Sequence, residues 1–161
     1  MSSMITLPQI VNASCSELDI RGVAHRGYFA SITDFKSYFD ANMSLIDLKN
    51  SLNLFNPEWP IYTRTNDSCP HSILTMLTWK NSVVSNGCLI EGTVENSVIG
   101  RGCQIKKGAV VKNCVILANS IIGEDVHVEN QVIDKWAQIT REREIVAEAG
   151  HPGYIRRDDI L

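Results

Sequence analysis

The sequence has no long apolar run, and no stretch approaches the ~18 consecutive apolar residues that a membrane-spanning helix needs. Its first residues, Met1 to Met4, lack the pattern of a secretory signal peptide. The formal net charge is only -3 over 161 residues, whereas a surface that binds nucleic acid is strongly basic. We therefore expect a cytoplasmic protein that binds neither a membrane nor nucleic acid.

Disulfide and zinc signatures are also missing. The five cysteines show neither CxxC spacing nor an even count: Cys15, Cys69, Cys88, Cys103 and Cys114. Secreted scaffolds and zinc sites are built on such regular cysteine spacing. We therefore expect reduced thiols and no bound metal.

A repeat of fixed length dominates the second half of the chain. Three stretches share one pattern, and each begins 17 residues after the last: 94–99, 111–116 and 128–133. A short fixed period built from still shorter units is typical of a solenoid whose neighbouring coils bury one another. The repeat predicts a mainly β fold in which three short strands make one coil of 17 residues.

Apolar anchors recur mostly six residues apart. They are Val84, Ile90, Val94, Ile99, Ile105, Val111, Ile116, Ile122, Val128, Ile133 and Ile139. Each anchor is expected to point inward and to stack on its equivalent one coil away, which suits stiff β-branched side chains. A second inward position, four residues after an anchor, carries a small side chain. Its members are Cys88, Cys103, Ala109, Ser120, Val126 and Ala137. The two cysteines among them are therefore expected to have a packing role.

The corners between strands need a residue that tolerates positive φ. Gly87, Gly102, Gly108, Asn119 and Asp125 stand at that offset. Trp136 takes the same offset in the last coil, so we expect the regular coil to relax or end there. The coils should run from near Lys80 to about Ile139, and the charged stretch after Thr140 should cap the open end.

The residues before the repeat predict a short α/β segment. Two stretches read as short strands, 19–24 and 27–30. Asp34 is a suitable helix N-cap, and apolar residues at helical spacing predict one helix near 35–48. Asn56, Pro57 and Pro60 mark a linker.

The repeats resemble the hexapeptide pattern of left-handed parallel β-helices, and the handedness is taken from that resemblance. The stretches 27–32, 37–45 and 59–63 resemble glucose-1-phosphate adenylyltransferase (ADP-glucose pyrophosphorylase), and 59–68 is most similar to its GlgD-type regulatory subunit. The resemblance implies that 1–56 is the tail of a nucleotidyltransferase domain with a linker. It implies that 57–161 is a left-handed β-helix domain with three-sided coils and a C-terminal cap.

The resemblance also implies a role in glycogen biosynthesis as an assembly and regulatory region. Ser31 stands where catalytic members of the family carry the aspartate that binds magnesium, and a neutral hydroxyl is a poor ligand for that cation. No Gly-rich loop followed by a basic residue is present. We therefore expect a non-catalytic fragment that pairs with a catalytic subunit or with itself, and we expect Mg and ATP only in the catalytic subunit.

A sugar-phosphate or other anionic effector is a further expectation from the resemblance. The basic residues in suitable regions are Arg64, Lys135, Arg141 and Arg143. A guanidinium group suits phosphate.

Three alternatives remain open on the sequence. A hexapeptide-repeat acyltransferase would use a histidine base, and His127 is the only histidine within the regular coils. A γ-type carbonic anhydrase would need three histidines on neighbouring coils, whereas His25, His71 and His151 lie outside them. A purely structural oligomerisation module would need no ligand.

Overall fold

The computed structural model describes residues 6–58, 60–62, 72–73 and 79–161. Three described helices come first, and described strands of two or three residues each follow. The helices are α1 (Leu7–Ser14), α2 (Phe35–Ser44) and α3 (Leu48–Leu54). The strands are β1 (Ser72–Ile73), β2 (Trp79–Lys80), β3 (Val83–Val84), β4 (Leu89–Ile90), β5 (Thr93–Glu95), β6 (Val98–Ile99), β7 (Gln104–Ile105), β8 (Val110–Lys112), β9 (Val115–Ile116), β10 (Ile121–Ile122), β11 (His127–Glu129), β12 (Gln131–Ile133), β13 (Gln138–Ile139), β14 (Glu144–Val146) and β15 (Gly153–Ile155).

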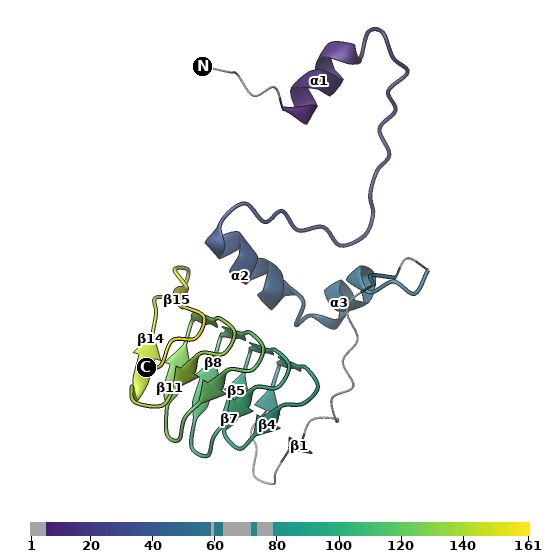
Figure 1. Ribbon diagram of the computed structural model, residues 1–161. Coiled ribbons are helices and arrows are strands. Elements are labelled where there is room, and N and C mark those ends of the chain that lie inside the picture. Colours follow the sequence, from purple (N-terminus) through teal and green to yellow (C-terminus); the bar gives the residue numbers. More distant parts are fainter. Residues whose placement is uncertain (1–5, 59, 63–71, 74–78) are drawn as a thin grey trace, which may run out of the picture.

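The strands form three parallel sheets of five strands each, and the chain visits the sheets in turn (Figure 1). Sheet A has the order β1-β4-β7-β10-β13, sheet B has β14-β11-β8-β5-β2, and sheet C has β15-β12-β9-β6-β3. Each strand therefore pairs with the strand three places along the chain, which is the topology of a three-sided parallel β-helix. The predicted fold is confirmed.

The core is a set of stacked columns. Ile99 pairs with Ile116 and Ile116 with Ile133 in sheet C, and the matching column in sheet A joins Ile105, Ile122 and Ile139. All the predicted anchors are buried except Val84, which is partly buried against the core. The small second positions are buried as well, so the packing role predicted for Cys88 and Cys103 is confirmed.

One corner is shorter than the repeat predicts. Thr93 pairs with Val110 at the 17-residue period, whereas Leu89 pairs with Gln104 only 15 residues on. Gly92 stands in that shortened corner, and a Cβ placed on it would lie 2.4 Å from the Ala109 carbonyl oxygen. Only a residue without a side chain fits so close an approach of two coils.

Positive φ marks all six predicted corner positions, from Gly87 (78°) to Trp136 (67°). The expectation that the coil relaxes or ends at Trp136 is wrong. Strand β13 follows it in register with β10, and β14 and β15 extend sheets B and C by one strand each. The Trp136 N–H donates to the Ala118 carbonyl (3.2 Å), so pairing on the preceding coil holds the strained corner in place.

A second set of corners, between sheets B and C, carries asparagine at positive φ in four successive coils: Asn81, Asn96, Asn113 and Asn130. Their side chains form a ladder. Asn81 donates to Asn96 (2.9 Å), Asn96 donates to Asn113 (2.7 Å), and Asn130 donates to the Ala147 carbonyl (2.8 Å). The asparagine recurs in the sequence at this edge, whereas the predicted corners all lie at the other two edges.

The segment before the coils is helical. The strands predicted over 19–24 and 27–30 are wrong, because both stretches are irregular. A strand needs a neighbour to receive its backbone hydrogen bonds, and residues 6–58 offer none. The helix predicted over 35–48 is divided, since the Asp47 carboxylate accepts from the Lys49 N–H (2.7 Å) and begins α3. The predicted N-cap is confirmed, because Asp34 accepts from the Ser37 N–H (2.7 Å).

The asparagine ladder gives the first testable prediction. Replacing Asn113 by alanine should lower the free energy of unfolding by about 2 kcal/mol, from a left-handed backbone cost of ~1–2 kcal/mol and a lost hydrogen bond of ~1 kcal/mol. Asn113→Gly removes the same hydrogen bond but tolerates the backbone, so it should cost about 1 kcal/mol less. Urea unfolding of both variants checks this, and equal losses would contradict a conformational role for the asparagine.

Candidate functional site

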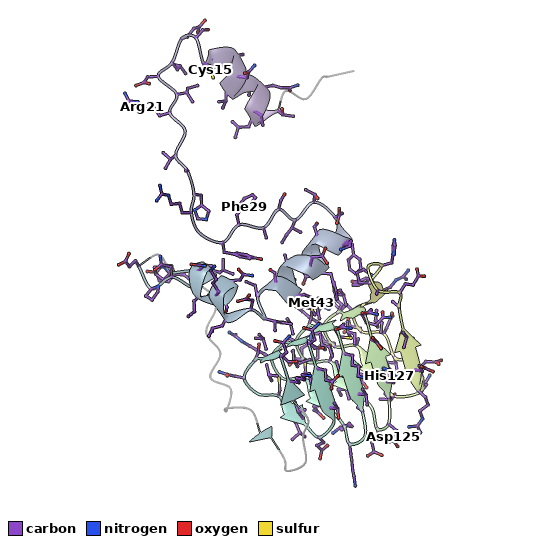
Figure 2. All side chains as sticks on the ribbon, turned by 180° about the vertical axis from the view of Figure 1, so that it is seen from behind. Cys15, Arg21, Phe29, Met43, Asp125 and His127 are labelled. Carbon is purple, nitrogen blue, oxygen red and sulfur yellow. The ribbon has the colours of Figure 1, made fainter. Side chains whose placement is uncertain are left out.

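The centre of the outer face of sheet C is covered by helix α2. Val115 and Val132 point away from the coil interior, yet they are only 1% and 2% exposed. Helix α2 contacts β9, and Met43 near its end lies against the β-helix (Figure 2). The helical segment is therefore docked on one side of the coils through apolar contact.

A short chain of contacts fixes the start of α2 against the last coil. The Phe35 ring meets the Tyr154 ring edge-on, with centroids 5.7 Å apart. The Tyr154 hydroxyl donates to Asp134 (2.7 Å), and the Lys135 N–H donates to the same carboxylate (2.7 Å). These donors hold the pKa of Asp134 below its usual value, with the Lys135 N–H as the larger cause, and the carboxylate raises the pKa of Tyr154.

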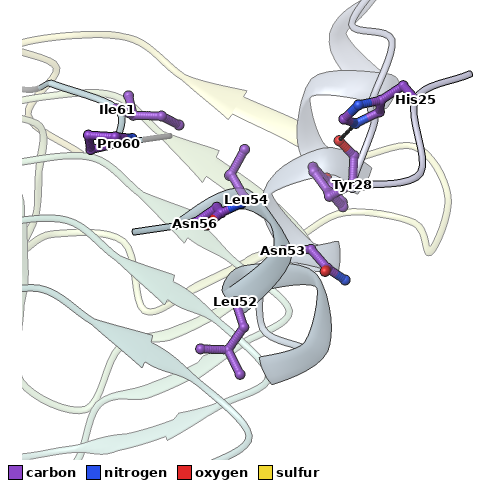
Figure 3. A pocket seen from close by; sticks show the side chains of 9 residues that line it. His25, Tyr28, Leu52, Asn53, Leu54, Asn56, Pro60 and Ile61 are labelled. Carbon is purple, nitrogen blue, oxygen red and sulfur yellow. Dashed lines mark hydrogen bonds between the residues drawn. The ribbon is translucent and has the colours of Figure 1, made fainter. Parts of the chain in front are cut away.

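The irregular chain before α2 is tied to the same helix. The Tyr28 hydroxyl lies 2.6 Å from the Ser44 hydroxyl and donates to the Ala41 carbonyl (3.3 Å). A shallow pocket lies beside Tyr28, between His25 and the end of α3 (Figure 3). Its walls are mostly apolar, and the Nε2 atom of His25 lies 3.1 Å from the Tyr28 carbonyl oxygen. The described residues that line this pocket include no carboxylate, lysine or cysteine.

Sheet B presents charged side chains outward. Lys112 lies 3.8 Å from Glu95, and His127 lies 3.5 Å from Glu129 and 4.0 Å from Glu144. His127 is half-exposed on β11, as predicted from the sequence (Figure 2). Its Nε2 has no hydrogen-bond partner among the residues that the structure describes. The ring is thus flanked by two carboxylates.

The predicted effector residues occupy different places. Lys135 stands at the corner between sheets C and A, whereas Arg141 and Arg143 stand at the corner between sheets A and B. Arg143 donates to the Glu124 carbonyl (2.7 Å) and is 4.0 Å from Asp125. Arg64 lies outside the described residues. The described cations are therefore separated by the width of sheet A and do not form one anion site there.

The remaining candidate reactive side chains, a buried cysteine and an exposed serine, do not belong to a common site. Cys114 donates to the Lys112 carbonyl (2.9 Å), and burial raises the pKa of its thiol to about 12. Ser31 is exposed in the irregular chain before α2. Within the described ranges, no three histidine, cysteine or acidic side chains gather as a metal site would require, and no helix there is long and apolar enough to span a membrane. His71 and Cys69 lie outside those ranges.

Comparisons with known proteins agree with this architecture. Residues 74–151 match the family model described as GlmU-like, C-terminal hexapeptide. The chain is 35% identical to the glycogen biosynthesis protein GlgD of Bacillus subtilis over 152 residues, which is 94% of this chain and 44% of that protein. It is 38% identical to a glucose-1-phosphate adenylyltransferase of Fervidobacterium nodosum over 107 residues, which is 66% of this chain and 26% of that enzyme.

These matches confirm that the chain carries a hexapeptide-repeat region like that of the glucose-1-phosphate adenylyltransferases. Its resemblance to the C-terminal region of the GlgD-type protein extends through the helical segment as well, since that match covers almost the whole chain. The chain spans less than half the length of either of these relatives.

The contacts around Asp134 predict that acid loosens α2 from sheet C. The folded-state pKa of Asp134 is lowered, so its contribution is complete above the unfolded-state pKa of about 3.9 and is lost as the pH falls through the lower folded-state value. The pKa of Asp34 is lowered mainly by the Ser37 N–H, so it acts in the same direction. Hydrogen exchange of α2 amides between pH 6 and pH 3, corrected for intrinsic rates, measures the loosening.

The variant Asp134→Asn separates the two carboxylates. It should reduce α2 protection at pH 6 and make the remaining pH dependence shallower, because only Asp34 still titrates. Asp158→Asn is the matched control, since Asp158 is an exposed carboxylate next to Arg157. Identical exchange profiles for Asp134→Asn and the unmodified chain would contradict this account of docking.

Proposed function

We propose that this chain is the C-terminal assembly and regulatory region of a glucose-1-phosphate adenylyltransferase-type subunit in glycogen biosynthesis, of the non-catalytic GlgD type. The observation that carries the proposal is the GlgD match over 94% of the chain, helical segment and coils together. The docking of α2 on sheet C supports it, because a docked helix can pass a change in a helical domain to the coils. The chain would associate with a catalytic subunit of the same family, with itself, or with both.

A non-catalytic role is consistent with the chemistry of the described residues. The described lining of the pocket beside Tyr28 contains no carboxylate, and Ser31 offers none for magnesium at the position that the family resemblance assigns to an aspartate. Magnesium and ATP would then act in the catalytic partner. In that partner, ATP and glucose 1-phosphate would give ADP-glucose and pyrophosphate.

Regulation by an anionic effector belongs to the same proposal. Arg64, Lys135, Arg141 and Arg143 remain the candidates for contacting a sugar phosphate. Because the described members occupy two corners, an effector would bind at one of them rather than bridge all four. A cytoplasmic location is also proposed, and the reduced buried thiols of Cys88, Cys103 and Cys114 support it.

The test is ADP-glucose synthesis from ATP and glucose 1-phosphate. It is measured for this chain, for the glucose-1-phosphate adenylyltransferase of the same organism, and for the two after co-expression. We expect no synthesis by the chain alone, and we expect co-purification with a changed rate or effector response for the pair. Synthesis by the chain alone would contradict the non-catalytic assignment, and failure to co-purify would contradict the partnership.

A matched pair of variants tests whether α2 docking transmits the effect. Phe35→Ala removes the ring that packs on Tyr154 and should weaken the change in the partner's rate several-fold. Phe29→Ala removes a ring of the same kind that is 79% exposed, and it should leave the effect intact. An equal effect of both variants would argue against transmission through α2.

A further inference from the structure

An open groove follows the edge between sheets C and A over four successive coils. Two parallel columns of described side chains line it. The corner column consists of residues at positive φ: Gly102, Asn119, Trp136 and Asp158. The sheet A column stands two residues further along each coil: Gln104, Ile121, Gln138 and Ile160. Three strand spacings of ~4.8 Å separate the first coil from the last, so the groove is ~14 Å long.

Trp136 forms the aromatic wall of this groove. Its side chain is 49% exposed, and its backbone is held at a φ of 67°. That conformation is costly for a bulky residue and easier for asparagine or glycine, which occupy the same corner in the two preceding coils. Strain that persists at such a position points to a use for the side chain. The half-exposed indole ring is therefore available to a ligand in the groove.

Three primary amides of the groove have unused hydrogen-bonding capacity. Among the residues that the structure describes, none donates to or accepts from the side chains of Gln104, Asn119 and Gln138. All three residues are half-buried, and each amide can donate two hydrogen bonds and accept two. A Cβ on Gly102 would lie 2.5 Å from the Asn119 Oδ1 atom, so the missing side chain at Gly102 makes room for this acceptor.

The groove carries little charge. Its described lining contains one carboxylate, Asp158, which lies 3.5 Å from Arg157, and it contains no lysine or arginine. A phosphate group in the groove would therefore meet a carboxylate without a lining cation. A purely apolar ligand would leave the amides without partners, which costs free energy. The lining suits a neutral ligand that both donates and accepts hydrogen bonds.

A sugar chain combines the properties that this lining requires. The hydroxyl groups around a pyranose ring donate and accept hydrogen bonds, as the amides do. The C–H groups on the faces of the sugar ring are apolar and can pack on the face of an indole ring. The described lining contains one aromatic ring, Trp136. One such ring suits a curved α-linked chain, which presents one sugar face to it, better than a straight β-linked chain.

We propose that this groove binds an α-linked glucan chain, with one sugar ring on Trp136 and its neighbouring hydroxyl groups on the three amides. The choice of an α-glucan among neutral sugars rests on the role in glycogen biosynthesis proposed above. The groove would hold the subunit on the polymer whose synthesis it serves. Because the groove is open, one side of the bound chain stays in water, and binding of a single oligosaccharide should be weak.

Native gel electrophoresis of the full chain, in gels with and without glycogen, tests the proposal. Glycogen should retard the unmodified chain. Trp136→Asn should raise the dissociation constant for glycogen at least ~10-fold, because it removes the aromatic wall. Tyr62→Ala is the control, since it removes an aromatic side chain that is 92% exposed and does not line the groove. Absence of retardation, or equal effects of the two variants, would overturn the proposal.

The amide contacts are tested by a change that keeps the length of the side chains. The double variant Gln104→Met with Gln138→Met removes two amides and should weaken glycogen binding several-fold, because sugar hydroxyl groups lose their partners. Lys112→Met is the control, since it makes a similar polar-to-apolar change on the outer face of sheet B. Unchanged binding by the double variant would show that the amides do not contact the ligand.

Competition in the same gels identifies the class of ligand. Maltoheptaose, an α-linked oligosaccharide of glucose, should release the chain from glycogen. Cellohexaose, which is β-linked, and inorganic phosphate should not release it at the same concentration. Equal release by cellohexaose would contradict the preference for α-linked chains, and release by phosphate alone would make the groove an anion site.

Trp136→Asn also provides a readout that a misfolded variant cannot imitate. Asparagine tolerates the left-handed corner, so this variant should unfold at a higher urea concentration than the unmodified chain while binding glycogen more weakly. Stability gained without loss of glycogen binding would rule out the proposed role of Trp136.

The groove and the proposed function can fail separately, because none of these measurements involves ADP-glucose synthesis. A chain that changes the rate of its catalytic partner but does not bind glycogen would reject the groove and keep the proposed function. A chain that binds glycogen through Trp136 but neither associates with that partner nor changes its rate would keep the groove and reject the proposed function.

Discussion

The fold depends on the stacking of equivalent residues from successive coils. Each inward residue lies on an equivalent residue of the next coil, so Ile99, Ile116 and Ile133 form one continuous apolar column. Backbone hydrogen bonds run along the same direction, for example from Val98 N–H to the Cys114 carbonyl (2.8 Å). Because packing and pairing share one direction, a change in one coil must be accepted by both of its neighbours. This constraint explains why the sequence repeats.

The corners follow from the same constraint. Three strands of two or three residues can close a coil only if the backbone turns sharply between them, and positive φ provides that turn at corners on all three edges. Glycine and asparagine meet the requirement at little cost. Trp136 meets it at a higher cost. It is held in this conformation because its N–H is bonded to the preceding coil and β13 pairs in register beyond it. Collective pairing can therefore fix a residue in a conformation that its own side chain disfavours.

The sequence predicted what repeats and missed what depends on a single contact. The anchors, the small interior positions and the glycine-containing corners recur in several coils, and each is confirmed. The shortened corner at Gly92 occurs once, so the repeat does not predict it. The division of the predicted helix depends on the Asp47 cap, and strand-like residues at 19–24 have no described strand beside them to pair with. The asparagines of the ladder do recur in the sequence, at the edge between sheets B and C, so this corner was predictable from the repeat.

The same holds for the candidate site residues: the sequence pattern predicts which way a side chain points but not which residues of other strands lie beside it. The outward position of His127 could be predicted from its neighbour Val126 pointing inward. Glu129 lies two residues further along the same strand, β11, whereas Glu144 belongs to β14 and only the stacking of coils brings it to the ring. The separation of Lys135 from Arg141 likewise follows from which strand each corner joins.

A solenoid with this interior leaves chemistry only to its three outer faces. The interior is filled by β-branched side chains, small residues and thiols held to carbonyls, so it has no room for a substrate. One outer face is used by α2, one carries charges that partly neutralise each other, and none of the described helices covers the third. A surface divided in this way serves contact between proteins better than reaction with a small molecule. The physical form of the coils therefore favours assembly independently of any resemblance to known proteins.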